Sequence, residues 1–142
     1  MQTGGKGKFC LTDAKGIIAK YLLDIEKLLK QTYWAKERDL KTIETSIKYS
    51  KCFAIIDTEY DVLVGFARAI TDYATMYYLT DVVVDEVYRG LGLGKWMLNW
   101  ILNEEVSLKG DGLLKTGNAQ ELYSNLGFEA CQSSYMWKPE KR

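Results

Sequence analysis

The chain has 142 residues, with 19 Lys and Arg against 19 Asp and Glu, so its formal net charge is zero. This length suits one domain covering residues 1–142, and the balanced charge lacks the cationic footprint of a general nucleic-acid-binding protein. Because histidine is absent, Ser-His-Asp and Cys-His catalysis and nearly all histidine-containing metal sites are excluded, so a general base must be a carboxylate, tyrosine, lysine or water.

The first half of the chain predicts one strand, two helices and three strands. Residues 1–8 are rich in glycine and lysine and are expected to form a flexible terminus, with a first strand lying somewhere in 9–19. Asp24 and Asp39 stand where helix N-caps are needed, and apolar residues recur after each at helical spacing. Three runs rich in Val, Ile and Tyr then predict strands of an antiparallel meander at 52–56, 62–70 and 76–84.

The second half predicts two helices and three strands, beginning with a glycine-rich segment at 89–95. The second of these helices has a capping box formed by Asn118 and Glu121, and Gly127 ends it. The elements are expected at 96–106 (helix), 113–116 (strand), 118–127 (helix), and 128–131 and 135–138 (strands). The complete order, β-α-α-β-β-β-α-β-α-β-β, is that of an α+β or mixed α/β domain.

The three cysteines have no CxxC spacing, so neither a disulfide framework nor a zinc site is expected, and no metal is predicted. No segment approaches the roughly 18 apolar residues of a membrane helix, and the N-terminus lacks the apolar core of a signal peptide. The sequence therefore predicts a cytoplasmic protein with neither membrane nor nucleic-acid partners.

The chemical signal of the sequence is a strand that runs into a glycine-rich loop at the start of a helix. Glycines allow positive φ and a close approach to a ligand, and the free N–H groups of a first helical turn attract an anion such as pyrophosphate. The nucleotide-binding patterns GxxxxGK[ST] and GxGxxG both fail here, because Lys95 stands where each needs its last glycine. The spacing that fits is Arg-x-x-Gly-x-Gly at Arg89, Gly92 and Gly94, and the alternative is a merely structural turn.

A second motif follows about 30 residues later, at 118–128, and reads Asn-Ala-x-x-Leu-Tyr-x-x-x-Gly-Phe. Together the two motifs resemble the GNAT superfamily of N-acetyltransferases over residues 24–138, and 33–35, 65–68, 71–73 and 78–81 are similar to a small, uncharacterised bacterial subgroup. The stretch 103–112 is shorter than that subgroup implies. The resemblance implies a twisted, mostly antiparallel sheet of about six to seven strands flanked by about four helices.

The resemblance further implies binding of acetyl-CoA between the strand at 76–84 and the strand at 113–116. Backbone groups of the first strand would bond pantetheine, an N–H near Val82 or Val83 would polarise the thioester carbonyl, and loop amides would bind pyrophosphate. The implied cofactor contacts are Val82, Val83, Val84, Arg89, Gly90, Leu91, Gly92, Leu93, Gly94, Lys95 and Asn118.

By the same resemblance, Tyr123 is the general acid that protonates the departing CoA thiolate. Asp81 is the first candidate base, because it lies in the strand beside the implied thioester, and its alternative is a hydrogen-bonding aspartate. Asp72, Glu104 and a water relay are further candidates. An acceptor pocket is expected from Tyr33, Trp34, Arg68 and Tyr73. The alternative for the aromatic residues is that they belong to the core. A buried Arg68 needs an anionic partner, which is Asp72, Asp81 or a substrate carboxylate.

The implied activity is transfer of an acetyl group to a primary amine of a small molecule or peptide. The alternatives are a non-catalytic acyl-CoA-binding sensor on the same fold and a transferase that uses a longer acyl-CoA. The acceptor amine and the oligomeric state stay open, with a homodimer through exposed C-terminal strands as one arrangement.

Overall fold

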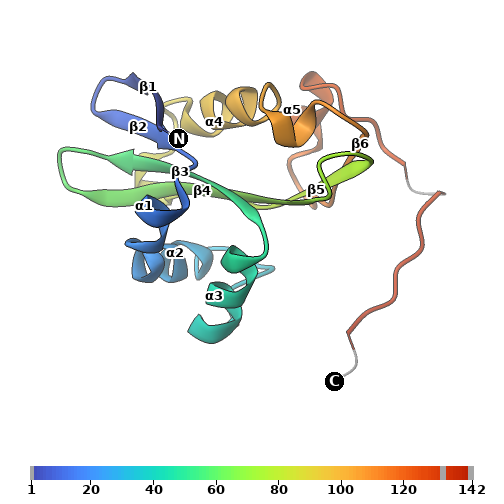
Figure 1. Ribbon diagram of the computed structural model, residues 1–142, viewed down its shortest axis with the longest axis horizontal. Coiled ribbons are helices and arrows are strands. Elements are labelled where there is room, and N and C mark those ends of the chain that lie inside the picture. The colour runs from blue at the N-terminus through green and yellow to red at the C-terminus, as the bar shows by residue number, and fades with distance from the viewer. Residues whose placement is uncertain (1, 132–133, 141–142) are drawn as a thin grey trace.

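The computed structural model describes residues 2–131 and 134–140 and is built on one six-stranded sheet, in the order β1-β2-β3-β4-β5-β6 (Figure 1). Neighbouring strands are antiparallel, except that β5 and β6 are parallel. The strands are β1 (Gln2–Lys6), β2 (Phe9–Thr12), β3 (Lys51–Asp57), β4 (Val62–Thr71), β5 (Met76–Val84) and β6 (Asp111–Leu114).

Helices cover both faces of the sheet, so the domain has three layers (Figure 1). One face carries α1 (Lys15–Ala19), α2 (Leu22–Leu29) and α3 (Leu40–Lys48), and the other carries α4 (Leu93–Ile101) and α5 (Gln120–Asn125). Two short 3-10 helices, η1 (Glu86–Tyr88) and η2 (Glu105–Ser107), lie in the connections. None of the helices in the described ranges is long and apolar enough to span a bilayer.

The sheet separates two apolar cores, as the alternation of side chains along its strands requires. On the α4 face, Phe53 and Leu79 pack with Met97. On the opposite face, Phe66 packs with Ile25 of α2 and Ile43 of α3. The central strands contribute side chains to both cores. The register of a strand therefore decides on which face of the sheet each functional side chain lies.

The two predicted helix caps behave differently. The carboxylate of Asp39 accepts a hydrogen bond from the Thr42 backbone N–H at 2.8 Å, and this confirms Asp39 as the N-cap of α3. Asp24 is not a cap, because α2 begins at Leu22, and Asp24 lies in its first turn. Its carboxylate accepts from the Leu63 backbone N–H at 3.1 Å and so fastens α2 to β4.

The start of α5 also differs from the prediction, whereas its end agrees. The helix begins at Gln120 without a side-chain cap, and the Ala119 N–H instead donates to the Thr116 hydroxyl at 3.0 Å, so the Asn118–Glu121 capping box is wrong. Gly127 has φ of 98°, and the Phe128 N–H bonds back to the Tyr123 carbonyl at 3.0 Å. This is a Schellman motif, and it ends α5 where the glycine predicts.

The mixed α+β class and the mostly antiparallel sheet are confirmed, but details differ at both ends of the chain. Gln2–Lys6 pairs with β2 instead of forming a loose terminus, and the one-turn helix α1 is additional, which gives five α-helices in the described ranges instead of about four. The predicted strands at 128–131 and 135–138 are wrong, because the described residues of this segment pair with no strand; residues 132 and 133 lie outside the described residues. The strands proposed to support a homodimer are therefore not formed.

Candidate functional site

The sheet opens between its two parallel strands. The ladder that joins β5 to β6 runs from Met76 and Asp111 to Leu79 and Leu114 and stops there, whereas β5 continues to Val84. In the described part of the chain, no strand pairs with residues 80–84 on the side of β6. The last five residues of β5 therefore offer a free backbone edge beside the point where β6 ends.

A β-bulge lies at the beginning of this free edge. The register between β4 and β5 shifts between Phe66 and Arg68, and Asp81 has φ of 55°, a left-handed conformation that non-glycine residues seldom adopt. The bulge changes the alternation along β5. Val82 packs with the α4 core and Val83 with the opposite core, and Asp81 bonds to side chains on the α2–α3 side.

Asp81 is held by three donors, two from the loop between α2 and α3 and one from β4. Its Oδ2 accepts from Nη1 of Arg38 and from Nε of Arg68, each at 2.6 Å, and its Oδ1 accepts from the Trp34 indole N–H at 2.9 Å. A further N–H of Arg68 reaches the Ser50 hydroxyl at 3.0 Å. The partner that the buried arginine needs is thus Asp81, one of the predicted candidates.

The environment of Asp81 does not suit a general base. Its carboxylate has no exposed surface, and burial by itself would raise its pKa, but the hydrogen bonds and charges of Arg38 and Arg68 outweigh burial and lower the pKa below its ordinary value. A carboxylate with a lowered pKa and three bound donors has little tendency to take a proton from an amine. The arrangement favours the alternative, an aspartate that fixes its neighbours.

The other two candidate carboxylates lie elsewhere. Asp72 occupies the turn between β4 and β5, where it accepts from the Thr75 hydroxyl and from backbone N–H groups of that turn, and these bonds hold the pKa of Asp72 far below its usual range. Glu104 precedes the 3-10 helix η2. Among the described residues, neither carboxylate contacts Asp81 or its three donors.

The glycine loop lies at the end of the free edge of β5. Gly92 is the N-cap of α4 with φ of 75°, Gly90 has φ of 86°, and α4 begins with no side-chain cap. The N–H groups of the first turn are therefore directed outwards without a capping side chain, next to the exposed Arg89 and Lys95. This is the predicted geometry of an anion site at a helix N-terminus.

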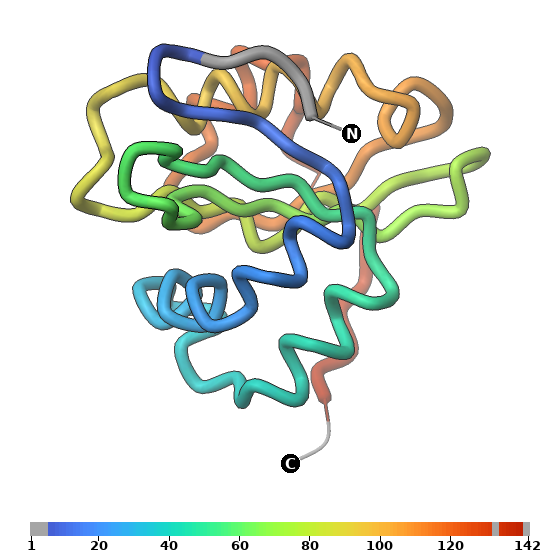
Figure 2. The backbone as a smooth tube through the Cα atoms, turned by 60° about the vertical axis from the view of Figure 1, so that its left-hand side comes forward, coloured from blue at the N-terminus to red at the C-terminus, as the bar shows by residue number. Residues whose placement is uncertain are grey.

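Lys6 joins this loop, although the sequence indicated only a flexible terminus. Its ammonium group donates to the Leu91 carbonyl at 3.1 Å, and a Cβ placed on Gly92 would lie 3.2 Å from its Nζ. Figure 2 shows the blue turn between β1 and β2 beside the yellow loop that precedes α4. The contact depends on pairing between β1 and β2, which the glycine-rich segment did not reveal.

Tyr123 is buried on α5, where its ring makes an edge contact with Phe128 at 5.9 Å between centroids. It lines a cavity of about 890 Å³ together with Tyr78 of β5 and Leu114 at the end of β6. Burial raises the pKa of Tyr123. Asn118 is exposed in the loop before the helix. Tyr123 thus lies beside the end of β6, where the two strands part.

Three of the four predicted acceptor residues come together around Asp81. Trp34 and Arg68 bond to it directly, and Tyr33 packs edge-on against Trp34 with ring centroids 5.0 Å apart. A Cβ added to Gly117 would lie 2.7 Å from the Tyr33 hydroxyl oxygen, so this ring reaches the loop that follows β6. Sequence reasoning missed Arg38, for which neither motif nor periodicity gave a signal.

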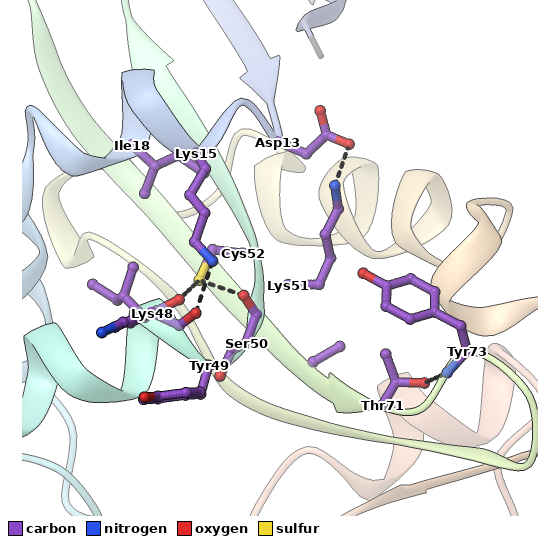
Figure 3. A pocket seen from close by; sticks show the side chains of 12 residues that line it. Asp13, Lys15, Ile18, Lys48, Tyr49, Ser50, Lys51, Cys52, Thr71 and Tyr73 are labelled. Atoms are coloured by element: carbon purple, nitrogen blue, oxygen red, sulfur yellow. Dashed lines mark hydrogen bonds and ion pairs between the residues drawn. The ribbon is translucent and has the colours of Figure 1, made fainter.

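Tyr73 lies apart from this group. It lines a separate cavity of about 410 Å³ at the end of β4, together with Thr71 and the start of β3 (Figure 3). Lys51 on its rim pairs with Asp13 at 3.0 Å, and Lys15 donates to the Lys48 carbonyl at 2.7 Å. Ser50 also lines this cavity and is the residue through which Arg68 borders it.

Comparison with known proteins gives a consistent result. The family model described as an acetyltransferase (GNAT) domain matches residues 48–130. The chain is 30% identical to the uncharacterized N-acetyltransferase ycf52 of Porphyra purpurea over 75% of the chain and 64% of the relative. It is 29% identical to the histone acetyltransferase TAP1 of Glycine max over 75% of the chain and 51% of that protein.

Among solved structures, a protein of Xanthomonas campestris assigned to the GNAT family of acetyltransferases is 28% identical and superimposes with a TM-score of 0.83 over 96% of both chains. The match covers nearly all of that protein, whereas the chain spans less than two thirds of the Porphyra relative and about half of the soybean relative.

Proposed function

The chain belongs to the GNAT family of acetyltransferases, and from that premise we propose that it transfers an acetyl group from acetyl-CoA to an amine of a small molecule or peptide. The observation that carries the proposal is the succession of a free strand edge, a bulge and an uncapped helix N-terminus along residues 80–95. A soybean relative is named a histone acetyltransferase, so lysine side chains belong among the acceptors to be tested.

The chemistry of these groups fits the pyrophosphate and the pantetheine arm of acetyl-CoA. N–H groups at the start of α4, with Arg89 and Lys95, would bind the pyrophosphate. Backbone groups of Val82 and Val84 would bond the pantetheine amides as an added strand does, because this edge of β5 has no strand partner among the described residues. When bound, acetyl-CoA supplies a thioester as the acetyl donor.

Two groups of the chain are proposed to act on the reaction. A backbone N–H of the bulge, at Val82 or Val83, would stabilise the negative charge that develops on the acetyl oxygen. The hydroxyl of Tyr123 would donate its proton to the sulfur as the carbon–sulfur bond breaks. A buried tyrosine with a raised pKa keeps its proton at neutral pH and is therefore suited to act as an acid.

The proton of the amine needs a different route. Asp81 is occupied by Arg38, Arg68 and Trp34, so we infer that the amine loses its proton to water before or during attack. The role of Asp81 in this proposal is to position the loop that contains Trp34 and Arg38. A dependence of the rate on the free-base fraction of the acceptor is the expected sign of this route.

The decisive measurement is a calorimetric titration with acetyl-CoA and CoA, with NAD and ATP as controls. Selective binding of acetyl-CoA and CoA supports the proposal, and CoA release with a panel of amines then separates an enzyme from an acyl-CoA sensor. If the folded protein binds none of these ligands, the glycine loop is structural and the proposed activity is wrong.

The Lys6→Gln variant tests the contribution of the β1–β2 turn. Loss of one cation beside the pyrophosphate site is expected to weaken CoA binding about three- to tenfold, the effect of one partly exposed charge–anion interaction. The same titration measures it, with the exposed Lys20→Gln as the control for charge alone. Equal CoA affinity in the two variants would show that Lys6 only packs against the loop.

A further inference from the structure

We propose that the acceptor amine carries a second, anionic group, a carboxylate or a phosphate, and that Arg38 binds this group. The inference rests on the proposed acetyl transfer and names the class of its acceptor. Its basis is the juxtaposition of Arg38, Trp34 and Tyr33 in one loop beside the bulge of β5.

The cluster around Asp81 has an excess of positive charge. Arg38 and Arg68 share one carboxylate, which leaves a net charge of +1. The exposed side-chain fractions are 0% for Asp81, 11% for Arg68 and 25% for Arg38. The excess charge therefore faces solvent through Arg38, where a ligand has access to it.

The guanidinium of Arg38 also has donors to spare. Of its five N–H bonds, the described residues engage one nitrogen, Nη1, which points at Asp81. Asp81 fixes the position of this group, so its remaining edge is pre-organised for a planar or tetrahedral anion. A guanidinium held in this way loses less conformational freedom on binding than a free surface arginine.

The place of Arg38 in the fold links it to the reaction. Its loop also contains Tyr33 and Trp34, whose exposed fractions are 64% and 43%. Tyr33 reaches over Gly117 in the loop after β6, and Trp34 bonds to Asp81 in the bulge of β5. The loop thus spans from β5 to β6 beside the point where they part, and an acceptor that approaches from the α2–α3 side meets these three side chains.

The neighbouring surface has the same sign of charge. The cavity in Figure 3 is lined by Lys15, Lys48 and Lys51 against the single carboxylate of Asp13, and Arg68 borders it through Ser50. A surface with a net positive charge attracts anionic ligands and raises their local concentration. It also lowers the fraction of protonated amine nearby, which favours the nucleophilic form. A lysine-rich peptide, in contrast, would bring further cations to this face.

The test compares acceptors that differ in one charge, at saturating acetyl-CoA and with rates expressed per free amine. Phosphoethanolamine is paired with ethanolamine, β-alanine with its carboxamide, and a lysine-rich peptide is the cationic probe. We expect kcat/KM to be about tenfold or more higher for the anionic member of at least one pair, the effect of one charge-assisted hydrogen bond. The pair that shows this preference tells whether the anionic group is a phosphate or a carboxylate.

Variants of Arg38 assign the effect to this residue. R38Q is expected to raise KM for the anionic acceptor about tenfold, with little change in kcat or in acetyl-CoA affinity, and R38K is expected to restore part of the loss. Lys36→Gln, an exposed lysine of the same loop, is the matched control and should leave the preference unchanged. If R38Q does not fold, the wild-type acceptor series decides by itself.

Equal use of neutral, anionic and cationic amines, or a preference for the lysine-rich peptide, would overturn this inference while leaving acetyl transfer intact. An R38Q variant that lowers kcat/KM for every acceptor alike would also overturn it, because that result indicates a purely structural arginine. Failure of the proposed function itself has a different signature, namely no binding of acetyl-CoA.

Discussion

Tyr123→Phe is expected to lower kcat about a hundredfold or more while leaving the affinity for acetyl-CoA nearly unchanged. The substitution removes the hydroxyl proposed as the general acid and keeps the ring that packs against Phe128. Positioned proton donors contribute roughly 10²–10⁴ in rate. Within the described residues the Tyr123 hydroxyl takes part in no side-chain hydrogen bond, so stability should change little. Single-turnover CoA release measures the rate of transfer, and calorimetry measures the affinity for acetyl-CoA.

Tyr78→Phe is the matched control, because Tyr78 lines the same cavity and loses the same atom. Burial raises the pKa of Tyr123 above the ordinary value of a tyrosine, so the hydroxyl should keep its proton over the range in which the amine loses its own. The wild-type rate should then rise from pH 7 to 9 as the amine deprotonates, without an earlier alkaline decline caused by the tyrosine. Equal kcat in wild type and Tyr123→Phe would assign protonation of the sulfur to water.

Asp81→Asn is expected to destabilise the fold by about 3 kcal/mol. The change keeps the shape of the side chain but leaves the nearly buried Arg68 and the partly exposed Arg38 without their shared counter-charge. Breaking a buried ion pair by removing one partner costs roughly 3–5 kcal/mol, and the amide can still accept some of the bonds. The midpoint of urea unfolding should fall by about 1–2 M.

The pH dependence of this loss has a defined sign. Because the pKa of Asp81 is lowered in the folded state, its stabilisation is present above its unfolded pKa of about 3.9 and is lost as the pH falls through the folded value. The stability gap between wild type and Asp81→Asn should therefore narrow in acid. Asp111→Asn, an exposed aspartate of β6, is the control and should have little effect.

The double variant Asp81→Asn with Arg68→Met separates charge from packing. If the unpaired arginine causes the loss, removal of its charge should recover part of the stability, and the two changes will not be additive. Additive losses would indicate that Asp81 supports the bulge by itself. A folded Asp81→Asn protein whose kcat falls by 10² or more, with unchanged stability, would instead restore the hypothesis that Asp81 is the base.

The sequence determined the local elements that carry their own signals. The strand at 76–84 has the predicted bounds, Asp39 caps α3, and Gly127 ends α5, because each depends on periodicity or on one residue with a strong backbone preference. The loop before α4 was predicted in the same way, from the backbone preference of its glycines. These features need no knowledge of distant parts of the chain.

Only the tertiary structure decided which distant residues meet. Arg38 and Asp81 are 43 positions apart, and Lys6 and Leu91 are 85 apart; no periodicity links such pairs. The bulge in β5 decided the orientation of Asp81, since one extra residue changes the face on which the side chains lie. The prediction of C-terminal strands was wrong because it also depended on distant residues. An alternating pattern becomes a strand only where the edge of a neighbouring strand pairs with it.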